Sequence, residues 1–196
     1  MSLRDDKRRW TMREVQAAAL DLFEAQGYAA VSVEAIAAAA GVSAPTVYRH
    51  FGTKERIILW DDYDPQMLAS IAAEARHLPP LRAVEAGLIA SLDRVYETDA
   101  KRILRRTRLV SGQPELKAAN APLLADLRAG LSAVLIDSYA RLSPERAQLL
   151  AAVIVVALET AIDRWVASRG RTSLRAHFSE TFSDLRNTLI SEAAIA

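Results

Sequence analysis

Arg49 carries a guanidinium on a short predicted helix. Its guanidinium could make a bidentate contact with a guanine edge, and Ala44 could touch the methyl group of a thymine. Val47 and Phe51, four residues apart, are expected to face inward, which leaves Arg49 on the outer face of a short helix. Pro45 offers no hydrogen bond on that face. Direct reading of bases would therefore be sparse, and DNA shape would carry more of the recognition.

Two short helices joined by a tight turn are expected to position this face. Ser32 is a suitable N-cap, and the apolar residues of segment 33–40 recur at i, i+3, i+4 and i+7. Gly41 directly after them supplies the left-handed conformation in which helices often end. Ser43 caps the second helix, and Pro45 fits its first turn. This arrangement predicts a helix-turn-helix, whose second helix is sized for the major groove.

A preceding helix is expected over about Met12 to Gln26. Thr11 and Glu14 form a T-x-x-E capping box at its start, and Gly27 follows its end. Three helices would then form a DNA-binding domain over residues 1–53.

The remaining residues, 54–196, are expected to form a second domain that is also all helical. A fourth helix begins near Lys54, is apolar on several sides, and is kinked or broken at Pro65. Further helices are expected over about 67–78, 81–97, 99–110, 115–142, 145–168 and 173–189, with Pro122 as a possible break. The fold class is therefore all-α, with about nine helices.

Composition excludes several function classes. The 196 residues carry a net charge of +1 and no cysteine, so disulfides, thiolate metal sites and cysteine nucleophiles are excluded. The charged N-terminus does not resemble a signal peptide, and the apolar run Leu149–Leu158 is too short to span a membrane. We expect a cytoplasmic protein without cofactor, metal or membrane contact. Positive charge is local: a basic arm at the start, and the end of the helix-turn-helix.

The segments LFEAQGY and SVEAIAAAAGVSAPTVYRHFGTKERI resemble the N-terminal DNA-binding domain of the TetR family of bacterial transcription regulators. The resemblance covers about Thr11 to Ile58, and GVS, T-x-Y-x-H-F and the following K-E stand at the family's spacing. It implies an all-helical C-terminal domain that binds an inducer and dimerises through its last two long helices.

The resemblance also implies roles for single residues. Tyr48, His50 and Lys54 match phosphate contacts, although Tyr48 could instead pack on the neighbouring helix, and His50 and Lys54 could simply be solvated. The basic N-terminal arm could track DNA or be a disordered tail. The predicted DNA-binding residues are Ser43, Ala44, Pro45, Thr46, Tyr48, Arg49, His50 and Lys54.

An effector site is expected among large residues of the second domain. The candidates are Trp60, Tyr63, Met67, Leu92, Tyr96, Arg106, Leu127 and Trp165, although any one of them could be an ordinary core residue. Arg106 lies beside the apolar stripe of KRILRRTRLV and needs an anion if it turns inward. That anion is either an Asp or Glu of a neighbouring helix or an acidic ligand. The second alternative predicts a hydrophobic effector with a negative head, such as a fatty acid or acyl thioester.

The helix over 145–168 is apolar nearly all round and must be covered on both sides. Either one large core buries it, or it forms a two-fold bundle with a second copy. The predicted interface residues are Val153, Val156, Phe178, Phe182 and Leu185. Two recognition helices would then reach successive major grooves, about 34–36 Å apart, on a palindromic operator.

Two other function classes are weaker interpretations. An enzyme is not supported, because the three histidines are scattered and no HExxH or glycine-rich phosphate loop is present. A protein–protein adaptor without DNA binding is disfavoured by the cluster around Tyr48. Within the regulator class, repression is favoured over activation only by family habit. The fourth helix is expected to act as the lever between effector and DNA.

Overall fold

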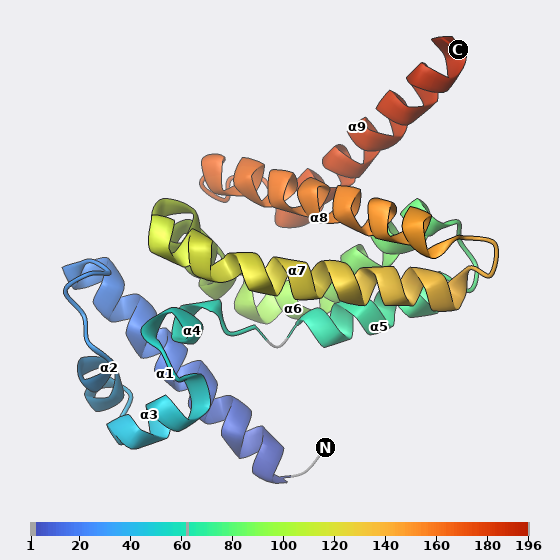
Figure 1. The fold of residues 1–196 in the computed structure, drawn as a ribbon. Coiled ribbons are helices and arrows are strands. Elements are labelled where there is room, and N and C mark those ends of the chain that lie inside the picture. The colour runs from blue at the N-terminus through green and yellow to red at the C-terminus, as the bar shows by residue number, and fades with distance from the viewer. Residues whose placement is uncertain (1–2, 62, 196) are drawn as a thin grey trace. The chain divides into compact units, whose positions relative to one another are not determined.

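The computed structural model describes residues 3–61 and 63–195, with side chains at 5–61, 63–94 and 99–188. Every regular element in these ranges is a helix, as the sequence predicts. The chain divides into two compact units (Figure 1). The N-terminal unit comprises residues up to Asp61 with Lys101–Asn120, and the C-terminal unit comprises Asp62–Ala100 with the residues from Ala121 onward.

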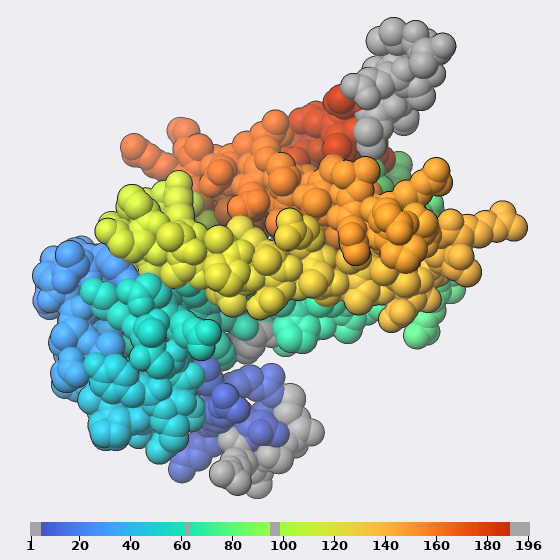
Figure 2. Space-filling model, viewed as in Figure 1, coloured from blue at the N-terminus to red at the C-terminus, as the bar shows by residue number. Residues whose placement is uncertain are grey.

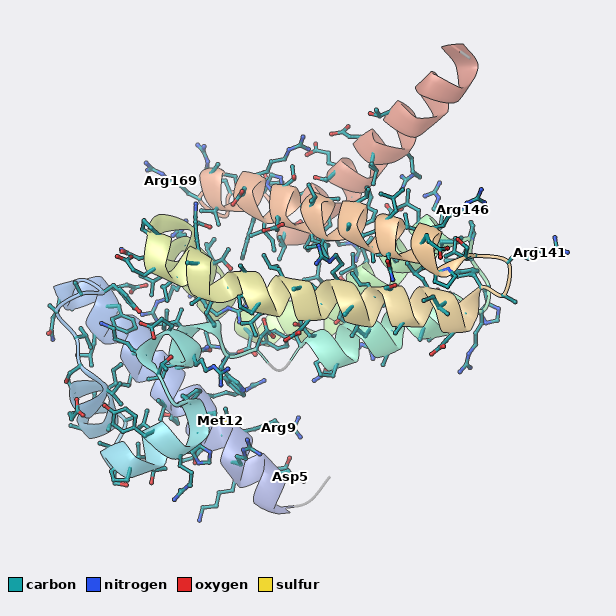
Figure 3. The ribbon with its side chains drawn as sticks, viewed as in Figure 1. Asp5, Arg9, Met12, Arg141, Arg146 and Arg169 are labelled. Atoms are coloured by element: carbon teal, nitrogen blue, oxygen red, sulfur yellow. The ribbon has the colours of Figure 1, made fainter. Side chains whose placement is uncertain are left out.

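The first helix begins earlier than the sequence predicts. α1 spans Leu3–Gln26, so Thr11 lies inside it and donates its hydroxyl to the carbonyl of Lys7 at 3.0 Å. The expected capping box is therefore wrong. Asp5 and Asp6 occupy the first turn, where carboxylates favour a helix N-terminus, and Arg9 pairs with Asp6 one turn later. The basic arm is thus part of a helix, along which Figure 3 labels Asp5, Arg9 and Met12.

The helix after the helix-turn-helix is short. α4 spans Lys54–Leu59, and α5 spans Asp64–Glu74 with Pro65 in its first turn. Pro65 therefore accompanies a break, since a proline fits the start of a helix but not its interior. The expected single lever from Lys54 into the second domain is wrong, because α4 has only six residues.

The core of the N-terminal unit joins α1–α4 to parts of two later helices. Val15, Ile36 and Phe51 are buried there, together with Leu116 from α7, which is fully buried. Gln16 is a polar centre in this core, 1% exposed. Its amide nitrogen lies 3.0, 3.1 and 2.9 Å from the carbonyl oxygens of Ile57, Ile58 and Trp60, which end α4.

The C-terminal unit is built from α5 and the long helices. α6 spans Pro80–Gly112, α7 Pro114–Ser138, α8 Pro144–Ala167 and α9 Leu174–Ile195. The predicted division of α6 near residue 98 is wrong: 33 residues form one helix. α7 likewise continues through Pro122. The largest fully buried side chains of this unit are Trp165, Phe182, Ile71, Leu131, Leu135 and Ile154.

Ion pairs attach α9 to α6 within the C-terminal unit. Arg175 binds both carboxylate oxygens of Asp93 at 2.8 and 2.7 Å, and Arg186 binds Glu85. α9 also packs along α8, where Arg164 donates to Asp184 at 3.1 Å. These contacts turn one face of α9 inward, so that its side chains become core.

Candidate nucleic-acid interface and effector site

The helix-turn-helix has the predicted caps and turn. α2 spans Val33–Ala39 and α3 spans Ala44–Phe51. The Ser32 hydroxyl accepts the Ala35 N–H at 3.1 Å, and the Ser43 hydroxyl accepts the Thr46 N–H at 3.3 Å. Gly41 adopts φ 66°, the left-handed conformation that favours glycine. These local bonds fix the direction of α3.

The outer face of α3 carries a short polar surface. Val47 and Phe51 are buried as predicted, while Pro45, Tyr48 and Arg49 are exposed. Tyr48 donates its phenol O–H to Glu34 of α2 at 3.0 Å, which raises the pKa of Tyr48 and contributes to lowering the pKa of Glu34. A phosphate contact by Tyr48 would have to replace Glu34 as the acceptor, because a phenol has one O–H.

Two of the predicted DNA contacts serve the helix cap. The hydroxyls of Ser43 and Thr46 lie 2.8 Å apart, and Ser43 also accepts the Thr46 N–H. Ala44 is half-buried beside this cap. The hydroxyl groups at the start of α3 are therefore already hydrogen-bonded within the cap. Arg49 remains as the long side chain with hydrogen-bond donors on the outer face of α3.

His50 lies in a basic environment. It is half-buried, and its pKa is lowered by burial first and then by the charges of Arg49 and Arg8. Arg8 belongs to the early turns of α1, so the arm that lengthens this helix brings its charge toward α3. A phosphate near this group would oppose the lowering, since an anion favours the protonated imidazole.

Lys54 has an internal role in the structure. Its ammonium donates to the carbonyls of Tyr28 and Val31 at 2.9 and 3.2 Å, and it stands 4.2 Å from the centre of the Tyr28 ring. Tyr28 in turn donates to Glu55 at 2.6 Å. Lys54 thus ties the turn between α1 and α2 to the start of α4, in addition to any contact it makes with DNA.

Two predicted effector residues belong to the N-terminal unit. Trp60 packs edge-to-face against Phe51, with ring centres 6.3 Å apart. Arg106 donates to Asp61 at 2.5 Å and to the Trp60 carbonyl at 3.1 Å. The first alternative for Arg106, a carboxylate of the chain itself, is therefore the one observed. Its guanidinium gives no reason to expect an acidic ligand.

The other effector candidates lie in the C-terminal unit. Tyr63 donates to Asp99 at 2.7 Å, and Met67, Leu92 and Leu127 are half-buried. Trp165 is 1% exposed. The side chain of Tyr96 lies outside the described residues.

The predicted interface residues divide into two groups. Phe178 and Phe182 are 5% and 0% exposed, so the chain itself buries them. Val156 is 61% exposed, while Val153 and Leu185 are half-buried. Of the five predicted interface residues, only Val156 of α8 is therefore strongly exposed, and Phe178 and Phe182 of α9 belong to the core of the C-terminal unit.

Sequence reasoning did not single out His177. This side chain of α9 is buried, and both ring nitrogens lack a hydrogen-bond partner among the described residues. Arg175, two positions earlier on α9, is tied to Asp93 of α6. A buried imidazole without a partner is costly, so such a group marks a candidate polar contact for a ligand. In the described residues no group of three or more acidic or histidine side chains is arranged to hold a metal ion.

Comparison with family descriptions gives two adjoining matches. Residues 16–59 match "Bacterial regulatory proteins, tetR family", and residues 78–190, more than half of the chain, match "MftR C-terminal domain".

Individual proteins give the same picture. The chain is 34% identical over 123 residues to the HTH-type transcriptional regulator TcmR of Streptomyces glaucescens, covering 59% of this chain and 54% of that protein. It is 30% identical over 125 residues to a protein of Mycobacterium tuberculosis named as a mycofactocin biosynthesis transcriptional regulator, MftR, covering 62% of each. The matches thus span less than two thirds of either relative.

Among solved structures, Thermus thermophilus FadR, a TetR-family transcriptional repressor in complex with lauroyl-CoA, has the same fold. The TM-score is 0.51 at 22% identity, over 88% of this chain and 91% of that one.

Proposed function

The chain belongs to the TetR family of bacterial regulatory proteins, and from this premise we propose that it is a transcription repressor that binds a palindromic operator as a dimer and is released by a small hydrophobic effector. The proposal of DNA binding is supported chiefly by the exposure of Arg49 and Tyr48 on the outer face of α3. Such a regulator acts in the cytoplasm.

Recognition on this surface divides between two kinds of contact. Tyr48, His50 and Arg8 would contact phosphates, which position the protein without reading sequence. Arg49 would make the principal base contact, because a guanidinium can donate two parallel bonds to guanine. The exposed ring of Pro45 adds only shape to this face. The operator should therefore hold one guanine per half-site whose replacement weakens binding strongly.

Arg49→Ala should weaken binding to the operator by about 10- to 100-fold and relax the preference for that guanine, as expected for one bidentate base contact. Fluorescence anisotropy with the upstream DNA of the regulator's own gene, at several salt concentrations, measures the loss.

The matched control for this test is Arg141→Ala. Arg141 lies in the turn after α7 (Figure 3). Its replacement by alanine removes the same positive charge at a position far along the chain from α3. Its affinity should stay within about twofold. Equal losses in both variants would show that only overall charge matters and would contradict base recognition by Arg49.

His177 replaces Arg106 as the residue that we expect to contact the effector, because Arg106 is already paired with Asp61, whereas the ring nitrogens of His177 have no hydrogen-bond partner among the described residues. We infer that the effector is a mostly apolar molecule in the C-terminal unit whose single polar group accepts a hydrogen bond from His177. Fatty acids have this form, and so does the acyl thioester end of an acyl-CoA, whose coenzyme A part would have to lie outside the apolar site; the Thermus structure is a complex with lauroyl-CoA. Coupling to DNA would then pass along α6, which contributes residues to both units, rather than along α4. Effector and operator would weaken each other's binding by the same factor.

Lauroyl-CoA and dodecanoate should release the operator complex, and dodecane, which lacks an acceptor, should not. His177→Phe should raise the concentration needed for release at least fivefold without changing operator affinity. Its melting temperature should not fall, since an unpartnered buried polar group is being replaced. Release that is equally effective with His177→Phe would remove His177 from the site, and no release by any acyl probe would overturn the effector class.

A further inference from the structure

Glu34 is the one acidic residue of the helix-turn-helix between Ser32 and Thr53. It lies in the first turn of α2, its side chain is exposed, and the other exposed residues of α2 are alanines. Figure 2 shows α2 (blue) and α3 (cyan) as neighbouring parts of one face of the N-terminal unit. This face therefore carries a single carboxylate, although the partner proposed for it is a polyanion.

The Glu34 carboxylate accepts the hydrogen bond that the Tyr48 phenol would give to a DNA phosphate. Oη of Tyr48 lies 3.0 Å from Oε1 of Glu34, and Tyr48 is 46% exposed. Hydrogen bonds from its own backbone, from Tyr48 and from Ser32 lower the pKa of Glu34, so this carboxylate is ionised at neutral pH. A carboxylate and a phosphate are both anionic acceptors, and a phenol has one O–H, so only one of them can hold Tyr48 at a time.

Helix stability does not explain why this carboxylate contacts the phenol. A carboxylate in the first turn of α2 favours the N-terminus of that helix whether or not a phenol binds it. Val47 and Phe51 already attach α3 to the core, since they are 1% and 4% exposed. The exposed bond between Glu34 and Tyr48 adds little to this packing, because water competes for both groups. Its main consequence therefore concerns what Tyr48 can bind.

We propose that Glu34 is an intramolecular competitor of the operator phosphate: its carboxylate holds Tyr48 in the free protein, releases it to a phosphate on binding, and then repels that phosphate. The proposal rests on the DNA binding proposed above and names a residue that limits its strength. The phenol O–H turns from one acceptor to the other by rotation about its C–O bond. A weakened operator complex is easier for an effector to release, because an effector typically changes affinity by only about 5- to 150-fold.

Fluorescence anisotropy of the full chain with the upstream DNA of the regulator's own gene tests the proposal. Glu34→Gln keeps an acceptor oxygen but removes the charge. It should bind about fivefold more tightly at low salt, roughly the factor that two like charges about 4 Å apart exert in water. The gain should shrink as salt is raised toward about 0.15 M, where the screening length is about 8 Å.

The matched control is Asp137→Asn, which removes one exposed carboxylate from α7 of the C-terminal unit. Its operator affinity should stay within about twofold of the wild type, because charges separated by more than the screening length interact weakly. An equal gain in Asp137→Asn would show that net charge alone raises the affinity, and would contradict a local effect of Glu34.

A double-mutant cycle separates competition from a structural clamp. Tyr48→Phe alone should change operator affinity by less than about threefold, because the lost phosphate bond is offset by the bond to Glu34 that no longer has to be broken. In the Glu34→Ala background the same change should weaken binding about tenfold, since nothing offsets the lost bond to a charged group. A structural clamp predicts the reverse: each single variant would melt earlier and bind more weakly, and the second change would add nothing.

The outcomes distinguish this proposal from the proposed function. Unchanged or weaker binding by Glu34→Gln, with a wild type that binds the operator, would overturn the competition and leave DNA binding by α3 intact. Equal losses from Tyr48→Phe in both backgrounds would do the same. If neither the wild type nor any variant binds the duplex, the repressor proposal and the competition by Glu34 are both wrong. Circular dichroism should show the same helix content in all variants, so that a change in affinity is not a change in fold.

Discussion

Gln16→Leu should destabilise the N-terminal unit by about 2–4 kcal/mol, the range expected when a buried hydrogen-bond network is broken. The side chain is 1% exposed, and its amide nitrogen lies within 3.1 Å of three carbonyl oxygens at the end of α4. Its amide oxygen accepts from Arg102 of α6 at 3.0 Å. Leucine fits the volume but leaves the carbonyls at the end of α4 without this donor, and removes the acceptor from Arg102.

Thermal unfolding followed by circular dichroism measures this loss, and Gln26→Leu is the matched control. Gln26 is exposed at the last position of α1, so its replacement should change stability by less than about 0.5 kcal/mol. Operator affinity should fall for Gln16→Leu alone, because the network holds α4 against the helix that precedes the recognition unit. Equal melting temperatures for the two variants would contradict this expectation, because they would show that the hydrogen bonds of the Gln16 amide do not add to the free energy of unfolding.

The helix-turn-helix was predictable from sequence because its determinants are local. Ser32 and Ser43 cap helices that begin one residue later, and Gly41 takes the left-handed conformation between them. Val47 and Phe51 are buried on the inner side of α3. Each of these features depends on residues within about four positions, where helix periodicity and capping chemistry act.

The start of α1 shows where local rules compete. Thr11 and Glu14 match a capping box, but residues 3–10 are themselves able to form helix, and a threonine inside a helix can bond to the carbonyl four residues earlier. An N-cap pattern therefore indicates a helix end only when the preceding residues cannot continue the helix. The same limit explains why α6 is one helix where the sequence predicts two, because residues 97–99 include no proline or glycine that would end it.

The partners of the arginines could not be predicted, because they are distant in sequence. The apolar stripe of α6 indicated that Arg106 turns inward, but Asp61 is 45 positions away, and no periodicity connects the two. Arg105 similarly binds Asp21 and Glu24, more than eighty positions earlier. The sequence left two possible partners for Arg106, a carboxylate of the chain, which was favoured, and an acidic ligand; the position of Asp61 beside α6 in the fold distinguishes them. His177 was missed for the same reason, since its lack of a partner is a property of the fold.

The two internal helix glycines of the C-terminal unit should respond in opposite directions to alanine. Gly87→Ala should destabilise by about 1–3 kcal/mol net, the usual cost of overpacking. An added Cβ would stand 2.5 Å from the Cα of Ile71, and backbone cannot move aside as a side chain can. α5 and α6 approach each other at this point only because Gly87 has no side chain, so alanine must separate them despite gaining about 1 kcal/mol of helix propensity.

Gly130→Ala supplies the matched comparison on α7. Its added Cβ would contact only the side chain of Leu68, closest at the methyl carbon Cδ1 at 2.8 Å, which is the free end of a flexible side chain. A rotation of Leu68 relieves this contact, so the gain in helix propensity should dominate and stability should rise by up to about 1 kcal/mol. The two free-energy changes differ by about 1–4 kcal/mol, so for a chain of this size the two variants should melt roughly 2–16 °C apart, with the wild type between them. Similar melting temperatures for both variants would mean that α5 does not pack closely against α6 at Gly87. The positions of the effector candidates on α5 and α6 would then differ from those described above.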